Sequence, residues 1–114
     1  MEILIRTRSV EVTDEVRELI ARRLQFALDA FKDRIEAASV HLADVNGPRC
    51  GVDKRCRITA AVRGIGNVVA RSSAETLLGA VTLTSSRLKY QVSEALRHAQ
   101  RPATESIRKM PAVA

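Results

Sequence analysis

The chain has 114 residues, 46% of them apolar and 3% aromatic, with a formal net charge of +6 and an isoelectric point of about 10.1. This length predicts one domain with an aliphatic core, and no apolar run approaches the roughly 20 residues that a transmembrane helix requires. The positive charge favours an acidic partner, nucleic acid before an anionic membrane surface. The first ten residues lack the apolar run of a secretory signal, so we expect a cytoplasmic protein with free thiols.

The first half of the chain predicts a strand, a helix and a second strand. Ile3 and Ile5 alternate with Leu4 and Arg6, which predicts a strand over 2–7. Thr13 can cap a helix whose apolar stripe continues to Phe31. The period returns to two over 38–45, which predicts a second strand with His41 on its polar face.

The second half predicts two more strands and a long helix. Alternation indicates strands over 55–63 and 67–72, joined by a hairpin of sequence GIGN. Ser72 and Glu75 have the spacing of a capping box, and the helical stripe that follows ends near 99–100.

The order of elements is therefore βαβββα, an α+β fold. The helical crossover predicts a parallel first pair of strands, and the short later links predict antiparallel pairs. Together they form a four-stranded mixed sheet with two helices packed on one face, leaving the other face open. We expect one domain over 1–101 and a flexible tail over 102–114.

Positive charge collects on two predicted surfaces, although either can be simply a solvated face. The open face of the sheet carries Arg6, Arg55, Arg57, Arg63 and Arg71 with almost no acid. Such a face can neutralise phosphates independently of sequence. The solvent side of the last helix carries Arg87, Tyr90 and Arg97, which can grip a backbone and stack on an exposed base. Glu94 is placed to pair with Arg97 and weaken that surface.

The stretch NGPRCGVDKRCRI, residues 46–58, contains both cysteines. Five residues separate Cys50 from Cys56, whereas zinc pairs are two residues apart, so we expect no metal and no cofactor. Strand parity turns Cys56 to the core, and Arg49 beside Cys50 can make that thiol somewhat reactive. The stretch is best interpreted as a basic loop that offers Arg49, Lys54, Arg55 and Arg57 to phosphates. No nucleophile with a matching base emerges, and an enzyme is not expected.

The segments VEVTDEVRELIARRL, residues 10–24, and ETLLGAVTLTSSRLKYQV, residues 75–92, resemble the short ribosome hibernation-promoting factors and ribosome-associated inhibitors. The resemblance covers about residues 2–100. It implies the βαβββα fold and binding to rRNA in the mRNA and tRNA channel of the small ribosomal subunit, which silences or protects ribosomes under stress or in stationary phase. Arg17, Arg23 and Arg87 match basic positions of that family. The chain departs from it at Tyr90 and Glu94, where the family has denser basic charge, and in its longer basic loop.

We therefore expect a monomeric protein that binds the small ribosomal subunit and its rRNA, with no membrane and no small-molecule substrate. The candidate RNA-binding residues are Arg17, Arg23, Arg49, Lys54, Arg55, Arg57, Arg63, Arg71, Arg87, Lys89, Tyr90 and Arg97. Three alternatives stay open: a general structured-RNA-binding module without ribosome specificity, a basic surface for an acidic protein or membrane, and a thiol-dependent activity at Cys50.

Overall fold

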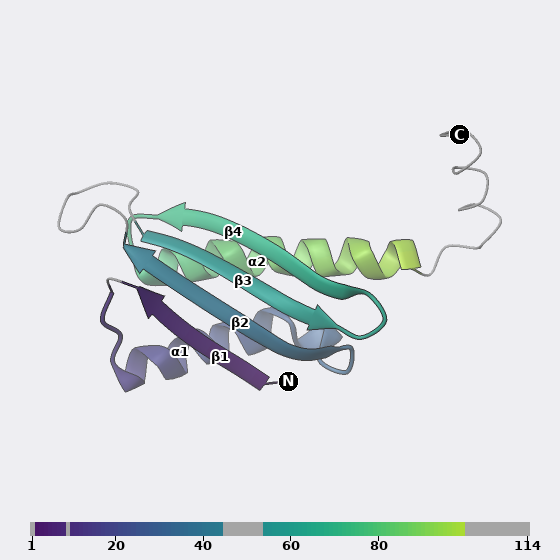
Figure 1. The fold of residues 1–114 in the computed structure, drawn as a ribbon, viewed down its shortest axis with the longest axis horizontal. Helices are drawn as coiled ribbons and strands as arrows, with labels where there is room; N and C mark the ends of the chain where they lie inside the picture. The colour runs from purple at the N-terminus through teal and green to yellow at the C-terminus, as the bar shows by residue number, and fades with distance from the viewer. Residues whose placement is uncertain (1, 9, 45–53, 100–114) are drawn as a thin grey trace.

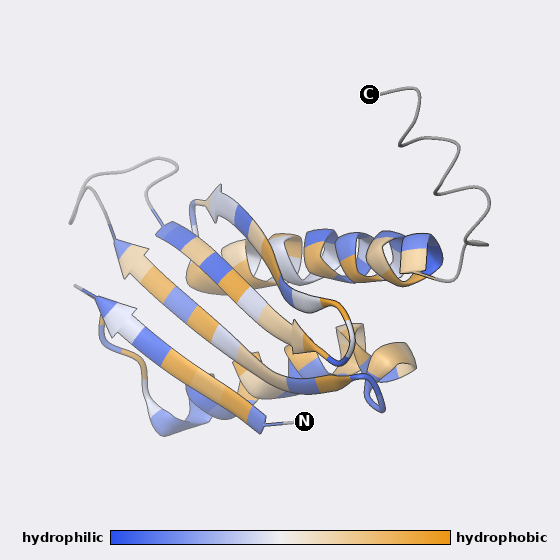
Figure 2. Cartoon of the chain, turned by 45° about the vertical axis from the view of Figure 1, so that its right-hand side comes forward, coloured by the Kyte–Doolittle hydropathy of each residue, from blue (hydrophilic) through white to orange (hydrophobic). Residues whose placement is uncertain are grey.

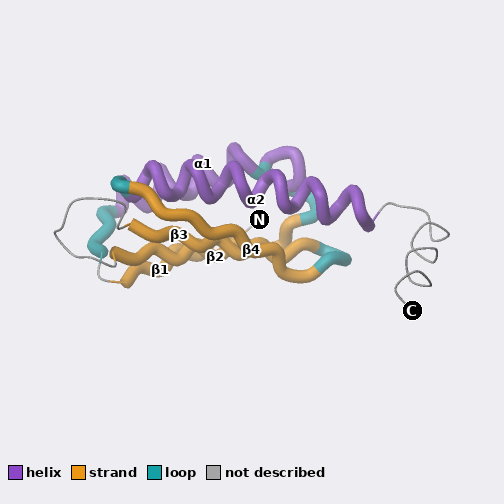
Figure 3. Tube along the Cα trace, turned by 90° about the horizontal axis from the view of Figure 1, so that it is seen from above, coloured by secondary structure: helices purple, strands orange, loops and turns teal. Residues whose placement is uncertain are grey.

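The computed structural model describes residues 2–8, 10–44 and 54–99, which form a sheet layer and a helix layer (Figures 1 and 3). In chain order the elements are β1 Glu2–Arg8, α1 Asp14–Ala27, a short 3-10 helix Asp29–Phe31, β2 Ile35–Asp44, β3 Lys54–Val62, β4 Gly66–Ala74 and α2 Leu77–Ala99. The strands lie in the order β1-β2-β3-β4. The β1–β2 pair is parallel and the other two pairs are antiparallel. The predicted fold class is confirmed, with both helices on one face of the sheet.

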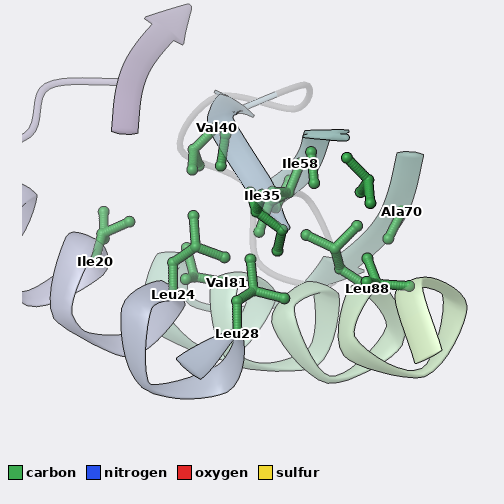
Figure 4. Packing of buried hydrophobic residues seen from close by; sticks show 14 of the residues in the cluster. Ile20, Leu24, Leu28, Ile35, Val40, Ile58, Ala70, Val81 and Leu88 are labelled. Carbon is green, nitrogen blue, oxygen red and sulfur yellow. The ribbon is translucent and has the colours of Figure 1, made fainter. Parts of the chain in front are cut away.

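Successive residues of the strands alternate between more and less buried positions, and hydrophilic and hydrophobic residues alternate in the first half of β3 (Figure 2). On β3 the residues Cys56, Ile58, Ala60 and Val62 are buried, as strand parity predicts. They pack against Ile20 and Leu24 of α1, Leu28 directly after it, and Val81 and Leu88 of α2 (Figure 4). Because the core is closed on this side only, the opposite face of the sheet is free to carry charge.

The first helix begins where the sequence predicts and ends earlier. The Oγ1 of Thr13 accepts a hydrogen bond from the backbone N–H of Val16 at 3.2 Å, and Asp14 adds a favourable charge in the first turn. The α-helix ends at Ala27, and the 3-10 helix that follows accounts for the apolar spacing out to Phe31. Strand β2 begins at Ile35, three residues before the predicted start at residue 38. A register irregularity between Ile35 and Ala37 breaks the alternation there, so the sequence pattern did not indicate this part of the strand.

The predicted capping box at Ser72 is wrong. Strand β4 continues to Ala74, and Ser72 points into the core, where it donates to the carbonyl of Ala80 at 3.1 Å and contacts the Thr84 hydroxyl. The helix is capped by Thr76 instead, whose Oγ1 accepts from the N–H of Gly79 at 3.0 Å. The spacing of serine and glutamate was therefore coincidental, and hydrogen bonds inside the core explain the inward serine.

Both edge strands are tied to the helix layer by an arginine. Nη1 of Arg17, on α1, donates to the carbonyl of Ile5 on β1 at 3.2 Å. Nη1 of Arg87, on α2, donates to the carbonyl of Arg71 on β4 at 2.8 Å. These bonds link the two helices to the two outer strands of the sheet.

No helix among the described residues is long and apolar enough to cross a membrane. The predicted tail over 102–114 and most of the basic loop, including Arg49 and Cys50, lie outside the described residues.

Candidate nucleic-acid interface

Strand register aligns basic residues into a row across the open face. Arg6 on β1 lies opposite His41 on β2, His41 opposite Arg57 on β3, and Arg57 opposite Arg71 on β4. Neighbouring strands are about 4.8 Å apart, so this row spans roughly 14 Å. Like charges placed directly opposite each other destabilise a sheet, so folding alone does not account for the row.

The next row in the same direction is Arg8, Ala43, Arg55 and Ser73. With Arg87 from α2 at the edge of β4, the two rows border one hollow at this end of the sheet. We call its six exposed guanidinium side chains the arginine patch: Arg6, Arg8, Arg55, Arg57, Arg71 and Arg87. Among the described residues, no aspartate or glutamate lines this hollow. The patch is therefore a concentrated, uncompensated site for anions.

His41 occupies the centre of the row as a neutral ring. Its Nδ1 lies 3.1 Å from Nη2 of Arg57 and must accept, because a guanidinium only donates. Burial lowers the pKa of His41, and the charges of Arg57 and Arg6 lower it further. The other ring nitrogen, Nε2, is buried without a hydrogen-bond partner among the described residues. The histidine thus fills the row without adding to its charge.

Two candidate residues stand apart from the patch: Lys54, predicted in the basic loop, and Arg63, predicted on the open face of the sheet. Lys54 forms an ion pair with Asp44 at 3.0 Å, so its charge is compensated. Arg63 lies in the turn after β3, six residues beyond Arg57, or about 20 Å along the strand direction. Its backbone N–H donates to the Arg34 carbonyl at 2.7 Å, and its side chain is exposed.

The candidate residues of α1 make contacts within the protein. Arg17 is half-buried and holds the β1 edge, as described above. Arg23 is exposed, and its Nη1 donates to Thr82 Oγ1 of α2 at 3.1 Å. Arg23 and Lys89 line a second hollow between the two helices, together with the exposed ring of Phe26. The structure therefore separates these two cations from the arginine patch.

The predicted surface on α2 is divided. Arg87 turns to the sheet edge and joins the arginine patch. Arg97 pairs with Glu94 at 3.3 Å, as their spacing predicted, whereas Tyr90 remains 67% exposed. The single surface expected along this helix is thus replaced by separate groups.

Cys56 is buried, as predicted, and burial raises the pKa of its thiol to about 11 in spite of a hydrogen bond with Thr84. The thiol is therefore protonated and unreactive at neutral pH. No cluster of His, Cys, Asp or Glu within the described residues could hold a metal ion.

Residues 3–100 match the family described as sigma 54 modulation protein / S30EA ribosomal protein. The chain belongs to the S30EA family. This membership confirms the resemblance to ribosome hibernation-promoting factors, and the family description names a ribosomal protein and no enzyme. A search among curated proteins found no significant match.

Two solved structures share the fold of this S30EA protein. The Thermus thermophilus Protein Y N-terminal domain is 26% identical, with a TM-score of 0.67 over 82% of this chain and 98% of that domain. A ribosomal subunit interface protein from Coxiella burnetii is 18% identical, with a TM-score of 0.69 over 82% of this chain and 96% of that one. Both likenesses cover nearly the whole of the related chain.

Sequence reasoning missed part of the patch. Arg8 was left out because the first strand was expected to end at residue 7, yet it has the same strand parity as Arg6. His41 was placed on the open face but not among the candidates. Phe26 was not among the candidates, although the sequence places this aromatic residue within four positions of Arg22 and Arg23, a combination typical of nucleic-acid binding.

Proposed function

We propose that this S30EA protein binds rRNA of the small ribosomal subunit in the mRNA and tRNA channel, and thereby silences or protects ribosomes under stress or in stationary phase. The observation that carries the proposal is the arginine patch, six exposed guanidinium groups that border one hollow in which no described residue contributes a carboxylate. Arginine suits this role because its planar fork binds phosphate oxygens in pairs and stays charged at every physiological pH.

The family supports the ribosome as the source of those phosphates. The Coxiella relative is named as a ribosomal subunit interface protein, and the family description names a ribosomal protein. On this proposal the protein acts in the cytoplasm as a monomer and needs no cofactor or small-molecule substrate. Its action is steric, since a rigid domain in the channel excludes mRNA and tRNA.

Sedimentation with purified small subunits at increasing salt tests the proposal. Each phosphate contact releases counterions, so six contacts predict a log–log salt slope of about −4 to −5. Subunits already filled with mRNA and tRNA should bind the protein much more weakly than empty subunits. A protein that stays at the top of the gradient at low salt, or that binds filled and empty subunits equally, contradicts the proposal.

A second candidate is a general structured-RNA-binding module. It is favoured by the composition of the patch, because phosphate contacts from arginine position RNA without reading its sequence. Equal affinity for an unrelated RNA duplex and for the small subunit would select this alternative.

A further inference from the structure

A second hollow lies between the two helices, on their solvent side. We call it the helix groove; it is lined by Arg22, Arg23, Phe26, Ala27, Thr82, Ser85, Ser86 and Lys89. Its lining residues come from α1 and α2 alone, whereas those of the arginine patch come from the strands and Arg87. The two surfaces are therefore separate.

The phenyl ring of Phe26 is the most prominent feature of the helix groove. It is 86% exposed, more than any other large apolar side chain among the described residues. The apolar stripe of α1 turns Ile20 and Leu24 into the core, so Phe26 contributes almost nothing to folding. Its flat apolar face is available to a ligand.

The charges around Phe26 are positive. The hydrogen bond from Arg23 to Thr82, at 3.1 Å, holds that guanidinium across the groove, and Lys89 is exposed on α2. Arg22 is partly compensated, because it pairs with Glu18 at 2.7 Å. In the part of the chain that the structure describes, no aspartate or glutamate lines the helix groove itself. An anionic ligand therefore fits better than a neutral or cationic one.

The groove also contains a polar group that lacks a partner. Ser85 is only 3% exposed, and its Oγ has no hydrogen-bond partner among the described residues. A buried hydroxyl is normally hydrogen-bonded, so a ligand with polar edges would supply what the protein does not.

We propose that the helix groove binds one unpaired nucleotide of single-stranded RNA, with its base stacked on Phe26 and its phosphate between Arg23 and Lys89. An aromatic face beside cations is the combination that binds single-stranded nucleic acid, because every base has a π-face and every nucleotide a phosphate. The inference rests on the proposed function in that the ligand is RNA, but it uses another surface of the molecule.

The sequence provides a direct probe, because the chain contains no tryptophan. Phe26→Trp places a single indole in the helix groove, and titration with a ten-nucleotide oligouridylate should quench its fluorescence. Leu83→Trp is the matched control, since Leu83 is exposed on the same helix layer but does not line the groove. It should show little quenching.

Affinity for the same oligouridylate gives a second readout. Phe26→Ala should weaken binding about five- to a hundredfold, whereas Phe26→Trp should retain it. Lys89→Gln should weaken binding less and reduce the salt slope by about 0.7. Phe26 is exposed, so its replacement should leave folding intact.

Three results would overturn the inference: equal quenching at the two tryptophan positions, unchanged affinity in Phe26→Ala, or self-association in sedimentation velocity that Phe26→Ala abolishes. The last would assign the helix groove to a second copy of the chain. If Phe26→Ala leaves the affinity for oligouridylate unchanged while the protein still binds small subunits, the inference about the helix groove is wrong and the proposed function stands. If oligouridylate quenches the indole but the protein does not bind small subunits, the proposed function is wrong and the nucleotide site in the helix groove stands.

Discussion

His41 shows at the scale of one residue how the arginine patch affects the fold. The ring is held neutral by burial and by Arg57 and Arg6, so protonation is less favourable in the folded protein than in the unfolded chain. Below the ordinary histidine pKa of about 6.5 the unfolded chain therefore binds more protons than the folded protein. Acidification must then favour unfolding.

We accordingly expect the free energy of unfolding to fall as the pH drops from 6.5 toward the lowered pKa of His41. His41→Gln should remove this part of the pH dependence, as measured by urea unfolding at pH 7 and pH 5. His98→Gln is the matched control, since His98 is exposed near the end of α2, and it should leave the loss in place. An unchanged pH dependence in His41→Gln would contradict this account.

Ser72 provides a second test at the same scale. Its buried hydroxyl bonds the Ala80 carbonyl and contacts Thr84, so Ser72→Ala should destabilise the protein by about 1 kcal/mol in urea unfolding. Ser73→Ala, next along the chain and exposed, should change stability by less than about 0.5 kcal/mol. If the two substitutions have the same effect, the hydrogen bonds of Ser72 do not stabilise the fold.

The start of α2 explains at the element scale why a glycine lies inside a helix. A Cβ on Gly79 would come within 2.8 Å of Thr76 Oγ1, the atom that caps the helix through the Gly79 N–H. The usual gain of about 1 kcal/mol from replacing helical glycine by alanine is therefore opposed by loss of a cap of similar strength.

A double-mutant cycle separates these two effects. Gly79→Ala alone should not stabilise the protein, and Thr76→Ala alone should destabilise it by about 1 kcal/mol. In the Thr76→Ala background, Gly79→Ala should stabilise by roughly 1 kcal/mol, because the opposing hydroxyl is gone. Thermal or urea unfolding measures all four proteins, and additive effects would rule out the coupling.

The elements also show how far the sequence leads. The spacing of apolar residues, every two in strands and every 3.6 in helices, was sufficient to predict the order βαβββα. It also placed Arg55, Arg57 and Arg71 on the open face of the sheet, because each element buries one face only. The early end of α1 and the early start of β2 were missed. The 3-10 helix after α1 keeps apolar residues at nearly helical spacing, so the end of α1 was not visible in the sequence. The register irregularity near Ile35 interrupts the alternation of apolar residues, so the start of β2 was not visible either.

The arginine patch, at the scale of the whole molecule, required information that alternation does not contain. Alternation assigns a residue to a face, whereas strand register decides that Arg6, His41, Arg57 and Arg71 form one row. The same register separates Arg63 from that row. The position of Arg87 depends on how α2 crosses the sheet, which tertiary packing sets.

The measurement that tests the central claim most directly compares arginines on the two ends of the sheet. Arg57→Ala/Arg71→Ala should bind small ribosomal subunits at least about tenfold more weakly than the wild type. Its salt slope should be smaller by about 1.4–1.8, because two phosphate contacts are lost. Arg63→Ala removes the same charge type about 20 Å away and should bind like the wild type. Wild-type binding by the double variant, or equal weakening in Arg63→Ala, would contradict the claim that ribosomal phosphates bind at the arginine patch.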